Sequence, residues 1–198
     1  MITYKLTIPH LLKANSQEFS NDIALREKKF GIWKSMTWKQ CYEEVKFISL
    51  GLKEKGIRKG STIGLLGNNT PRWVLGEISA QSIKCSPMGI YSDALESEIE
   101  YILNYSSCRV LFVEDEEQAD KILSLNNSRK KVSLIIYDEE KGMNKYDDDR
   151  LISYKKLKEI GFAINEKNNN KYEDYLNIIT EEDICVLCPT SGTTSNPK

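Results

Sequence analysis

Apolar residues recur along this chain with two different periods, and the alternation of these periods divides the sequence into strands and helices. Nearly continuous apolar runs occur at 61–67, 84–91, 109–114 and 131–137, and segments of helical periodicity fill the stretches between them. Apolar runs separated by amphipathic helices are typical of a parallel sheet that is covered on both faces. The pattern therefore predicts an α/β fold with a mostly parallel sheet, whose alternating strand–helix core spans 61–137.

Local start signals place the helices between these strands. Thr70 is a good N-cap residue, and Pro71 follows it at the first helical position, where proline is preferred. Asp93 and Glu96 are expected to begin the next helix, and Asp115 is expected to cap the third. Each of the three intervals therefore contains a helix with its own start signal.

The first part of the chain, 1–60, has a different organisation. A short amphipathic helix is followed by two short strands that a turn near Gly31 connects. Thr37 and Gln40 have the spacing of a capping box ahead of a clear helix, and Gly56 is placed to end that helix. We therefore expect a helix, a hairpin and a second helix before the sheet begins.

The remaining chain is more polar. Residues 138–181 are charged, rich in asparagine and weakly periodic, and we interpret them as a surface excursion around a modest helix at about 153–160. Residues 182–198 return as an apolar strand that carries a polar loop at its C-terminal end. Ligands of open α/β sheets bind at that end of the strands.

Composition limits the class of protein. The chain has 198 residues, 40% hydrophobic and 29% charged, which is ordinary for a globular domain. A formal net charge of −1 argues against nucleic-acid binding. One histidine and five cysteines leave little scope for a metal site, and the odd cysteine count without a signal peptide favours a reducing compartment. No apolar run approaches the ~18 residues needed to span a bilayer, so we expect a cytoplasmic chain.

Several isolated features have ordinary explanations. Cys185 and Cys188 form a lone C-x-x-C on the apolar strand, where we expect core residues rather than a redox or zinc pair. His10 has no nearby serine or carboxylate partner in the sequence, which favours a surface or cap role. The aspartates at 147–149 are interpreted as solvated surface, and Tyr91 is left as a residue that could face the cleft.

The final loop, "CPTSGTTSNPK", combines small residues and hydroxyls with a terminal lysine. Small residues expose backbone N–H groups, hydroxyls add donors, and Lys198 adds a positive charge, so the loop suits a polyphosphate. A polar turn after a strand has the same composition and remains the alternative. Pro197 keeps the chain extended before the lysine, which differs from a Walker A loop.

This loop resembles the phosphate loop of the adenylate-forming enzymes, a superfamily of acyl-CoA synthetases, luciferases and peptide-synthetase adenylation domains. The chain departs from the family pattern at Ser195, where the family has glycine, and matches it at Thr190, Ser191, Gly192, Thr193, Thr194, Pro197 and Lys198. Upstream stretches such as "GLLGNNTPRWV" and "PMGIYSDALESEIEYILN" resemble the N-terminal segments of bacterial-type long-chain fatty acid–CoA ligases. The resemblance implies the N-terminal subdomain of the adenylate-forming enzyme fold.

The resemblance also implies a reaction. A fatty acid carboxylate would attack the α-phosphate of Mg-ATP to release pyrophosphate, and coenzyme A would then displace AMP to form a thioester. The loop would hold the β- and γ-phosphates through Thr190, Ser191, Gly192, Thr193, Thr194, Ser195 and Lys198. The family's Mg²⁺, ribose and acyl-binding residues and its catalytic lysine follow this loop. Residues 1–198 are therefore interpreted as a partial AMP-binding domain, truncated at the phosphate loop and expected to be inactive alone.

Two further hypotheses stay open at this point. The chain could belong to an adenylate-forming ligase for a short-chain, aryl or amino acid, because the residues that select the acid would lie downstream. It could also be a non-catalytic nucleotide-binding module. Peripheral membrane contact and the oligomeric state are left undecided by the sequence.

Overall fold

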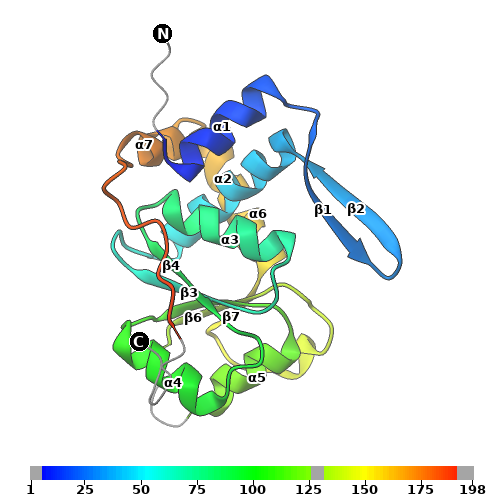
Figure 1. The fold of residues 1–198 in the computed structure, drawn as a ribbon, viewed down its shortest axis with the longest axis vertical. Helices are drawn as coiled ribbons and strands as arrows, with labels where there is room; N and C mark the ends of the chain where they lie inside the picture. Colours follow the sequence, from blue (N-terminus) through cyan, green and yellow to red (C-terminus); the bar gives the residue numbers. More distant parts are fainter. Residues whose placement is uncertain (1–5, 126–131, 191–198) are drawn as a thin grey trace.

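The computed structural model describes residues 6–125 and 132–190 and shows a central sheet between two layers of helices (Figure 1). Five strands form this sheet in the order β4–β3–β5–β6–β7, and every neighbouring pair is parallel. The strands are β3 (Thr62–Leu66), β4 (Ser86–Ile90), β5 (Val110–Val113), β6 (Leu134–Tyr137) and β7 (Leu151–Ser153). The predicted α/β fold with a parallel sheet is confirmed.

Helices cover both faces of the sheet, as Figure 1 shows. One face carries α2 (Trp38–Glu54), α3 (Pro71–Gln81) and α6 (Tyr154–Lys167), and the other carries α4 (Glu96–Tyr105) and α5 (Glu116–Ser124). Successive residues of β5 alternate between the two cores, with Phe112 in the first and Leu111 in the second. Because a central strand is buried on both sides, its sequence is apolar without interruption.

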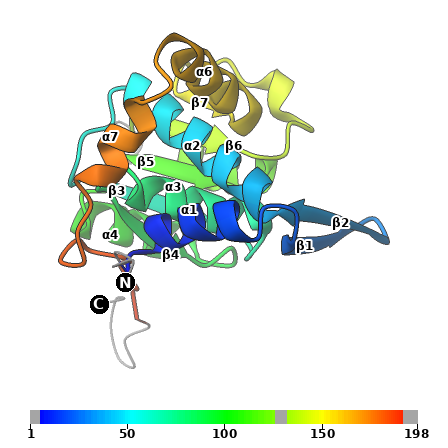
Figure 2. The same ribbon diagram turned by 90° about the horizontal axis from the view of Figure 1, so that it is seen from above.

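A third apolar cluster joins the N-terminal helix to the last helix. Here α1 (Ile8–Glu18) and α7 (Lys171–Asn177) pack over α2 and α3, with Leu12, Leu75 and Tyr172 buried between them. Viewed from above, α1 and α7 lie on the same side of the sheet as α2 (Figure 2). A single 3₁₀ turn, η1 (Met143–Lys145), interrupts the connection from β6 to β7.

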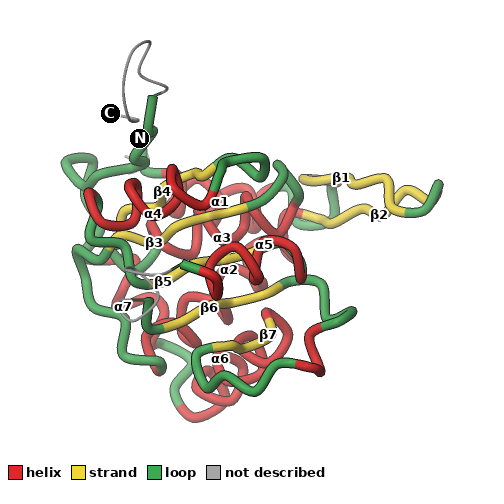
Figure 3. The backbone as a smooth tube through the Cα atoms, turned by 90° about the horizontal axis from the view of Figure 1, so that it is seen from below, coloured by secondary structure: helices red, strands yellow, loops and turns green. Residues whose placement is uncertain are grey.

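A two-stranded hairpin extends away from this body. Strands β1 (Ile23–Lys29) and β2 (Ile32–Thr37) pair in antiparallel fashion, and their far end projects beyond the sheet (Figures 2 and 3). The base is held by backbone hydrogen bonds, including Trp38 N to Asp22 O at 3.1 Å. The predicted turn near Gly31 is confirmed.

Most of the predicted helix starts are confirmed by their side-chain hydrogen bonds. Thr37 and Gln40 form the reciprocal capping box of α2, with Thr37 N donating to Gln40 Oε1 at 2.8 Å. Thr70 accepts from the backbone of α3 and Asp115 from the backbone of α5. The expectation for Asp93 is wrong, because α4 begins at Glu96. The backbone N–H of Leu95, the residue before the helix, donates to the Glu98 carboxylate instead.

The interpretation of 138–181 as a surface excursion is wrong, although a helix does begin near 153. The segment contributes strand β7, the longer helix α6 and helix α7. Tyr154, Leu157 and Tyr172 in this segment are almost completely buried. Polar residues dominate the segment because each element buries one narrow stripe, so its average composition hides its role in the core.

Helices α2 and α6 cross at unusually short range. A Cβ atom at Gly161 would lie 2.6 Å from the carbonyl carbon of Phe47 and 2.9 Å from the backbone nitrogen of Gly51. Gly51 on α2 faces the Leu157 backbone of α6 in the same way. The two helices therefore touch backbone to backbone, which requires a glycine on each side.

The strand expected at 183–190 is reduced to one parallel bridge between Leu187 and Met88. Leu187 N donates to Pro87 O at 2.8 Å, but the ladder cannot continue in either direction. On one side, the next ladder bond would run from the backbone nitrogen of Pro87 to Cys185 O. On the other side, it would run from the backbone nitrogen of Pro189 to Gly89 O. Proline has no N–H group, so neither bond can form. The carbonyl of Cys185 accepts instead from Gln81 Nε2 at 2.9 Å.

Within the described residues, the helices are too short or too polar to cross a bilayer.

Candidate functional site

The segment 184–190 brings Thr190, the first residue of the candidate phosphate loop, to the carboxyl end of the sheet. It runs along the outer edge of β4 in the direction of that strand, so that Thr190 lies exposed past the end of the sheet. Of the predicted site residues, Thr190 is described, and Ser191, Gly192, Thr193, Thr194, Ser195 and Lys198 lie outside the described residues. Their phosphate-binding role therefore stays a prediction.

A hollow of about 220 Å³ lies beside this segment, at the carboxyl ends of β3 and β4. Trp73 lies beneath it with its indole N–H donating to Leu65 O at 3.3 Å, and a side chain at Gly89 would press on the indole ring at 3.1 Å. Tyr91 is 74% exposed at the rim, as the sequence allowed. The hollow is lined by Gly67, Asn69, Trp73, Gly89, Ile90, Tyr91, Val186, Leu187, Cys188 and Pro189.

The other natural crevice of this sheet is already filled by protein. Strand β3 has β4 on one side and β5 on the other, so the strand order reverses there and a ligand crevice is expected between β3 and β5. Glu114 closes it by accepting from the backbone and side-chain nitrogens of Asn68 at 2.7 and 2.9 Å. About 20 Å³ remains, which is room for roughly one water molecule. The open position is therefore the β4 edge, where the candidate loop emerges.

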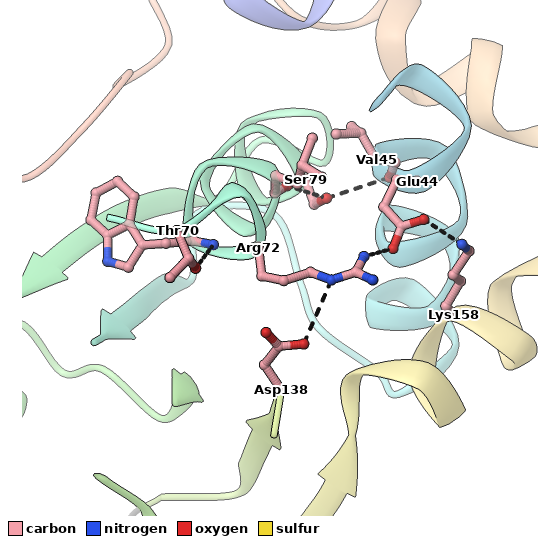
Figure 4. A network of polar contacts seen from close by, with 9 residues as sticks. Glu44, Val45, Thr70, Arg72, Ser79, Asp138 and Lys158 are labelled. Carbon is pink, nitrogen blue, oxygen red and sulfur yellow. Dashed lines mark hydrogen bonds and ion pairs between the residues drawn. The ribbon is translucent and has the colours of Figure 1, made fainter. Parts of the chain in front are cut away.

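A charged network fixes this end of the sheet (Figure 4). Arg72, in the first turn of α3, donates to the buried carboxylate of Glu44 on α2, and its Nε lies 3.6 Å from Asp138 Oδ1 after β6. Lys158 of α6 pairs with the other oxygen of Glu44. Buried carboxylates need partners of this kind, and here two cations from different helices supply them. The network ties three helices to the carboxyl end of β6.

The surroundings of Asp138 and Arg72 identify the network as a structural one. Burial raises the pKa of Asp138, and the nearby Arg72 guanidinium opposes that rise. Arg72 also stacks 4.5 Å above the ring of Tyr154, a residue of the core. Because its hydrogen bonds and its planar face are engaged within the protein, Arg72 serves to hold α3 in place. The sequence did not reveal this network, since its members are far apart in the chain.

The five cysteines fall into two groups. Cys185 and Cys188 are exposed, so the expectation that they are core residues is wrong. Burial raises the pKa of the remaining thiols, Cys41, Cys85 and Cys108, to about 11. Across 6–125 and 132–190, no three His, Cys, Asp or Glu side chains gather closely enough to hold a metal ion.

Two other features match their ordinary interpretations. His10 is half-buried in the first turn of α1, with its Nδ1 2.6 Å from the hydroxyl of Thr7. Asp147 and Asp149 are exposed as expected, whereas Asp148 between them is half-buried and pairs with Arg150, at 2.8 Å from Oδ1 to Nε. Neither group adds chemistry to the candidate site.

Comparison with known proteins places this geometry in a family. A family model described as "AMP-binding enzyme" matches residues 12–198. Fatty acyl-CoA synthetase A of Dictyostelium discoideum is 29% identical, with 97% of this chain and 29% of the relative covered. Long-chain-fatty-acid–CoA ligase ACSBG2 of Homo sapiens is 26% identical, with 98% of this chain and 28% of the relative covered. The chain thus spans less than a third of the length of these relatives.

Solved structures support the fold. The anthranilate CoA ligase AuaEII, in complex with anthranoyl-AMP, aligns with a TM-score of 0.73 at 23% identity, over 100% of this chain and 34% of that chain. A luciferase-like enzyme of the mealworm Zophobas morio aligns with a TM-score of 0.76 at 17% identity, over 100% of this chain and 43% of that chain. The predicted fold of the adenylate-forming enzymes is therefore confirmed.

The resemblance to long-chain fatty acid–CoA ligases agrees with these relatives. The two relatives named above come from eukaryotes, and the bacterial-type character inferred from the sequence remains a prediction. The family match extends across the sheet, the β4 edge segment and the loop that follows it, and on this ground the chain belongs to the AMP-binding enzyme family.

Proposed function

We propose that this chain forms the phosphate-loop-bearing, N-terminal part of an ATP-dependent long-chain fatty acid–CoA ligase. The observation that carries the proposal is the family match over 12–198, which ends in "TSGTTSNPK", a stretch whose first residue, Thr190, lies at the open edge of β4. The curated relatives that cover nearly the whole chain are named as fatty acyl-CoA synthetases or long-chain ligases.

The proposed chemistry has two steps. A fatty acid carboxylate oxygen attacks the α-phosphorus of ATP, and the bond to pyrophosphate breaks. The thiolate sulfur of coenzyme A then attacks the acyl carbon, and AMP leaves with the electron pair of the cleaved bond. In both steps the protein must hold charged groups in position, which is how such reactions are mainly assisted.

The role proposed for the loop is to hold the leaving pyrophosphate. Hydroxyls and backbone N–H groups of Thr190, Ser191, Gly192, Thr193, Thr194 and Ser195 would donate to its oxygens, and Lys198 would offset its charge. The edge segment supports this role because it delivers Thr190 past the end of β4, beside an open hollow.

A magnesium ion belongs to the proposal as a companion of ATP. The described residues offer no cluster of three acidic, histidine or cysteine side chains for it. We therefore assign no step to the ion within this part of the protein. A cytoplasmic location is likewise proposed, on the basis of the unpaired, odd set of cysteines.

Pyrophosphate exchange tests the proposal. The intact protein that carries this chain is incubated with ATP, labelled pyrophosphate, Mg²⁺ and one acid, chosen from palmitate, acetate, benzoate or an amino acid. We expect exchange with palmitate to exceed exchange with the others, and the 198-residue chain alone to give none. Exchange confined to an aryl, short-chain or amino acid would mean a different ligase. No exchange with any acid would favour a nucleotide-binding module.

Lys198→Ala tests the role of the loop in the same assay. A charge-assisted hydrogen bond contributes about 1.5–3 kcal/mol, so we expect use of ATP to fall roughly tenfold to a hundredfold. The fatty acid Michaelis constant should change little. Lys167→Ala, at the exposed end of α6, is the matched control and should behave as the parent protein. Unchanged use of ATP in Lys198→Ala would refute the assignment.

A further inference from the structure

The β1–β2 hairpin ends in an exposed turn that the fold itself does not explain. The last pair of the ladder is Lys29 with Ile32, so the turn consists of Phe30 and Gly31. Both have positive φ, 51° and 79°, as in a type I′ turn. The first position of such a turn favours Asn, Asp or Gly, and a bulky residue in the left-handed region is an outlier. Phe30 is therefore an unfavourable choice for the turn alone.

The side chains at this tip are large, apolar and in solvent. Phe30 is 92% exposed, Ile32 67% and Trp33 63%. The hairpin stands clear of the body (Figures 1 and 2), and a groove of about 470 Å³ lies between it and helices α2 and α3. An unfavourable conformation that presents apolar side chains to water indicates a binding role rather than a folding role.

Positive charge surrounds the apolar tip. The stretch 26–34 carries four cationic side chains and a single carboxylate. Lys28 lies opposite Trp33 in the ladder, with its ammonium group 6.0 Å from the ring centroid. Lys29 Nζ lies 3.0 Å from Glu139 Oε2, and this ion pair connects the hairpin to the loop after β6. The tip is thus apolar at its end and cationic behind it.

This combination matches the interface of an anionic bilayer. Aromatic rings settle at the level of the lipid headgroups, and lysines behind them reach the lipid phosphates. Binding of this kind grows with the apolar area inserted and with the attraction between the cations and anionic lipids. Stacking on nucleic-acid bases fits less well, because Lys28 already lies over the face of Trp33.

We propose that the β1–β2 hairpin is a membrane-interface anchor, in which Phe30, Ile32 and Trp33 insert among the headgroups of an anionic bilayer while Lys28 and Lys34 contact lipid phosphates. The anchor is separate from Thr190, the described residue of the candidate loop, which lies past the end of β4. Its use follows from the proposed function, since a long-chain fatty acid partitions into membranes, but its binding is measured without ATP or acid.

Co-sedimentation with lipid vesicles tests the anchor. The full chain is mixed with vesicles of phosphatidylcholine alone or of phosphatidylcholine with phosphatidylserine, at low and high salt. We expect sedimentation with the anionic vesicles and its reduction by salt, because exposed charges are screened. The emission of Trp33 should shift to shorter wavelength on binding. Trp33→Phe should abolish this shift while the protein still sediments.

The decisive variant is Phe30→Asn. It removes the apolar tip while creating the Asn-Gly pair that type I′ turns prefer, so the hairpin should remain folded. We expect its vesicle binding to fall roughly tenfold, from the apolar burial lost. Ile32→Thr keeps a β-branched residue in the strand and should weaken binding in the same direction. Lys28→Gln and Lys34→Gln should each cost about fivefold.

Tyr105→Asn is the matched control, because Tyr105 is 76% exposed at the end of α4 on the opposite face of the sheet. It should bind vesicles as the parent chain does. Equal binding by the parent chain and Phe30→Asn would overturn the proposal, as would the absence of binding to anionic vesicles. Self-association that Phe30→Asn abolishes would assign the tip to a second copy instead. None of these outcomes bears on pyrophosphate exchange.

Discussion

Replacing Gly161 by alanine should separate α2 from α6 and destabilise the chain. The added Cβ would lie 2.6 Å from the carbonyl carbon of Phe47 and inside the contact distance of its oxygen. Carbon atoms in contact prefer about 3.5–4.0 Å, so one helix must shift by about 1 Å. Neither atom of Phe47 can yield, since both belong to the backbone of α2.

The magnitude follows from two opposing effects. Overpacking of a core costs about 1–3 kcal/mol, and a collision between backbones places this case at the upper end. Alanine in a helix interior returns about 1 kcal/mol relative to glycine. The net loss should be about 2 kcal/mol, or roughly 4–8 °C in the melting temperature of a chain of this size.

A thermal melt followed by circular dichroism measures this loss, with Gly76→Ala as the control. Gly76 also lies within a helix, but its added Cβ would meet the end of the Leu65 side chain at 3.2 Å, which can move. The control should melt within a few degrees of the parent chain. If Gly161→Ala melted at or above the parent temperature, the backbone contact between α2 and α6 would be refuted.

Three other predictions concern side chains. Under native conditions, Cys185 and Cys188 should react quickly with a disulfide reagent and the three buried cysteines slowly, and fast labelling of all five would contradict the burial described. Burial alone would raise the pKa of Glu173, but hydrogen bonds from Lys13 and Tyr42 lower it overall. The stabilisation by ionised Glu173 is therefore complete above pH 4.5 and is lost as the pH falls through the lowered pKa. In urea unfolding, Glu173→Gln should reduce the free energy of unfolding by about 1 kcal/mol at neutral pH, and this free energy should then depend less on pH in the acidic range. Glu44→Gln should reduce the free energy of unfolding by about 2 kcal/mol and lower the urea midpoint accordingly, because Arg72 and Lys158 lose their shared carboxylate. An unchanged midpoint would show that the network does not contribute to stability.

Helix starts were predictable because their signals are local. Thr37, Thr70 and Asp115 each accept from the backbone N–H three residues ahead, so the sequence contains the complete interaction. Strand β7 could not be found in this way. It has three residues, and it exists because β6 offers a parallel edge to Leu151. A strand this short depends on its neighbour more than on its own pattern.

Long-range contacts also limited the prediction at the candidate site, where a strand was expected and a single bridge formed. The apolar pattern of 184–189 favours a strand, but its place beside β4 could not be inferred from that pattern. The length of that strand was decided by prolines on two separate segments, Pro87 and Pro189, whose missing N–H groups matter only when the segments lie side by side. The charged network around Glu44 was missed for a related reason, because its members come from three helices and from the residue after β6.

The bridge from Leu187 to Met88 also implies an order of events during synthesis. All five strands of the sheet and the helices that cover it precede residue 184, so they leave the ribosome before the segment that leads to the candidate loop. Parts made first tend to fold first, and contacts between neighbouring elements form faster than contacts between distant ones. We therefore expect the edge segment to dock on a sheet that already exists, so that a nascent chain completes its scaffold before residues 184–190 are in place.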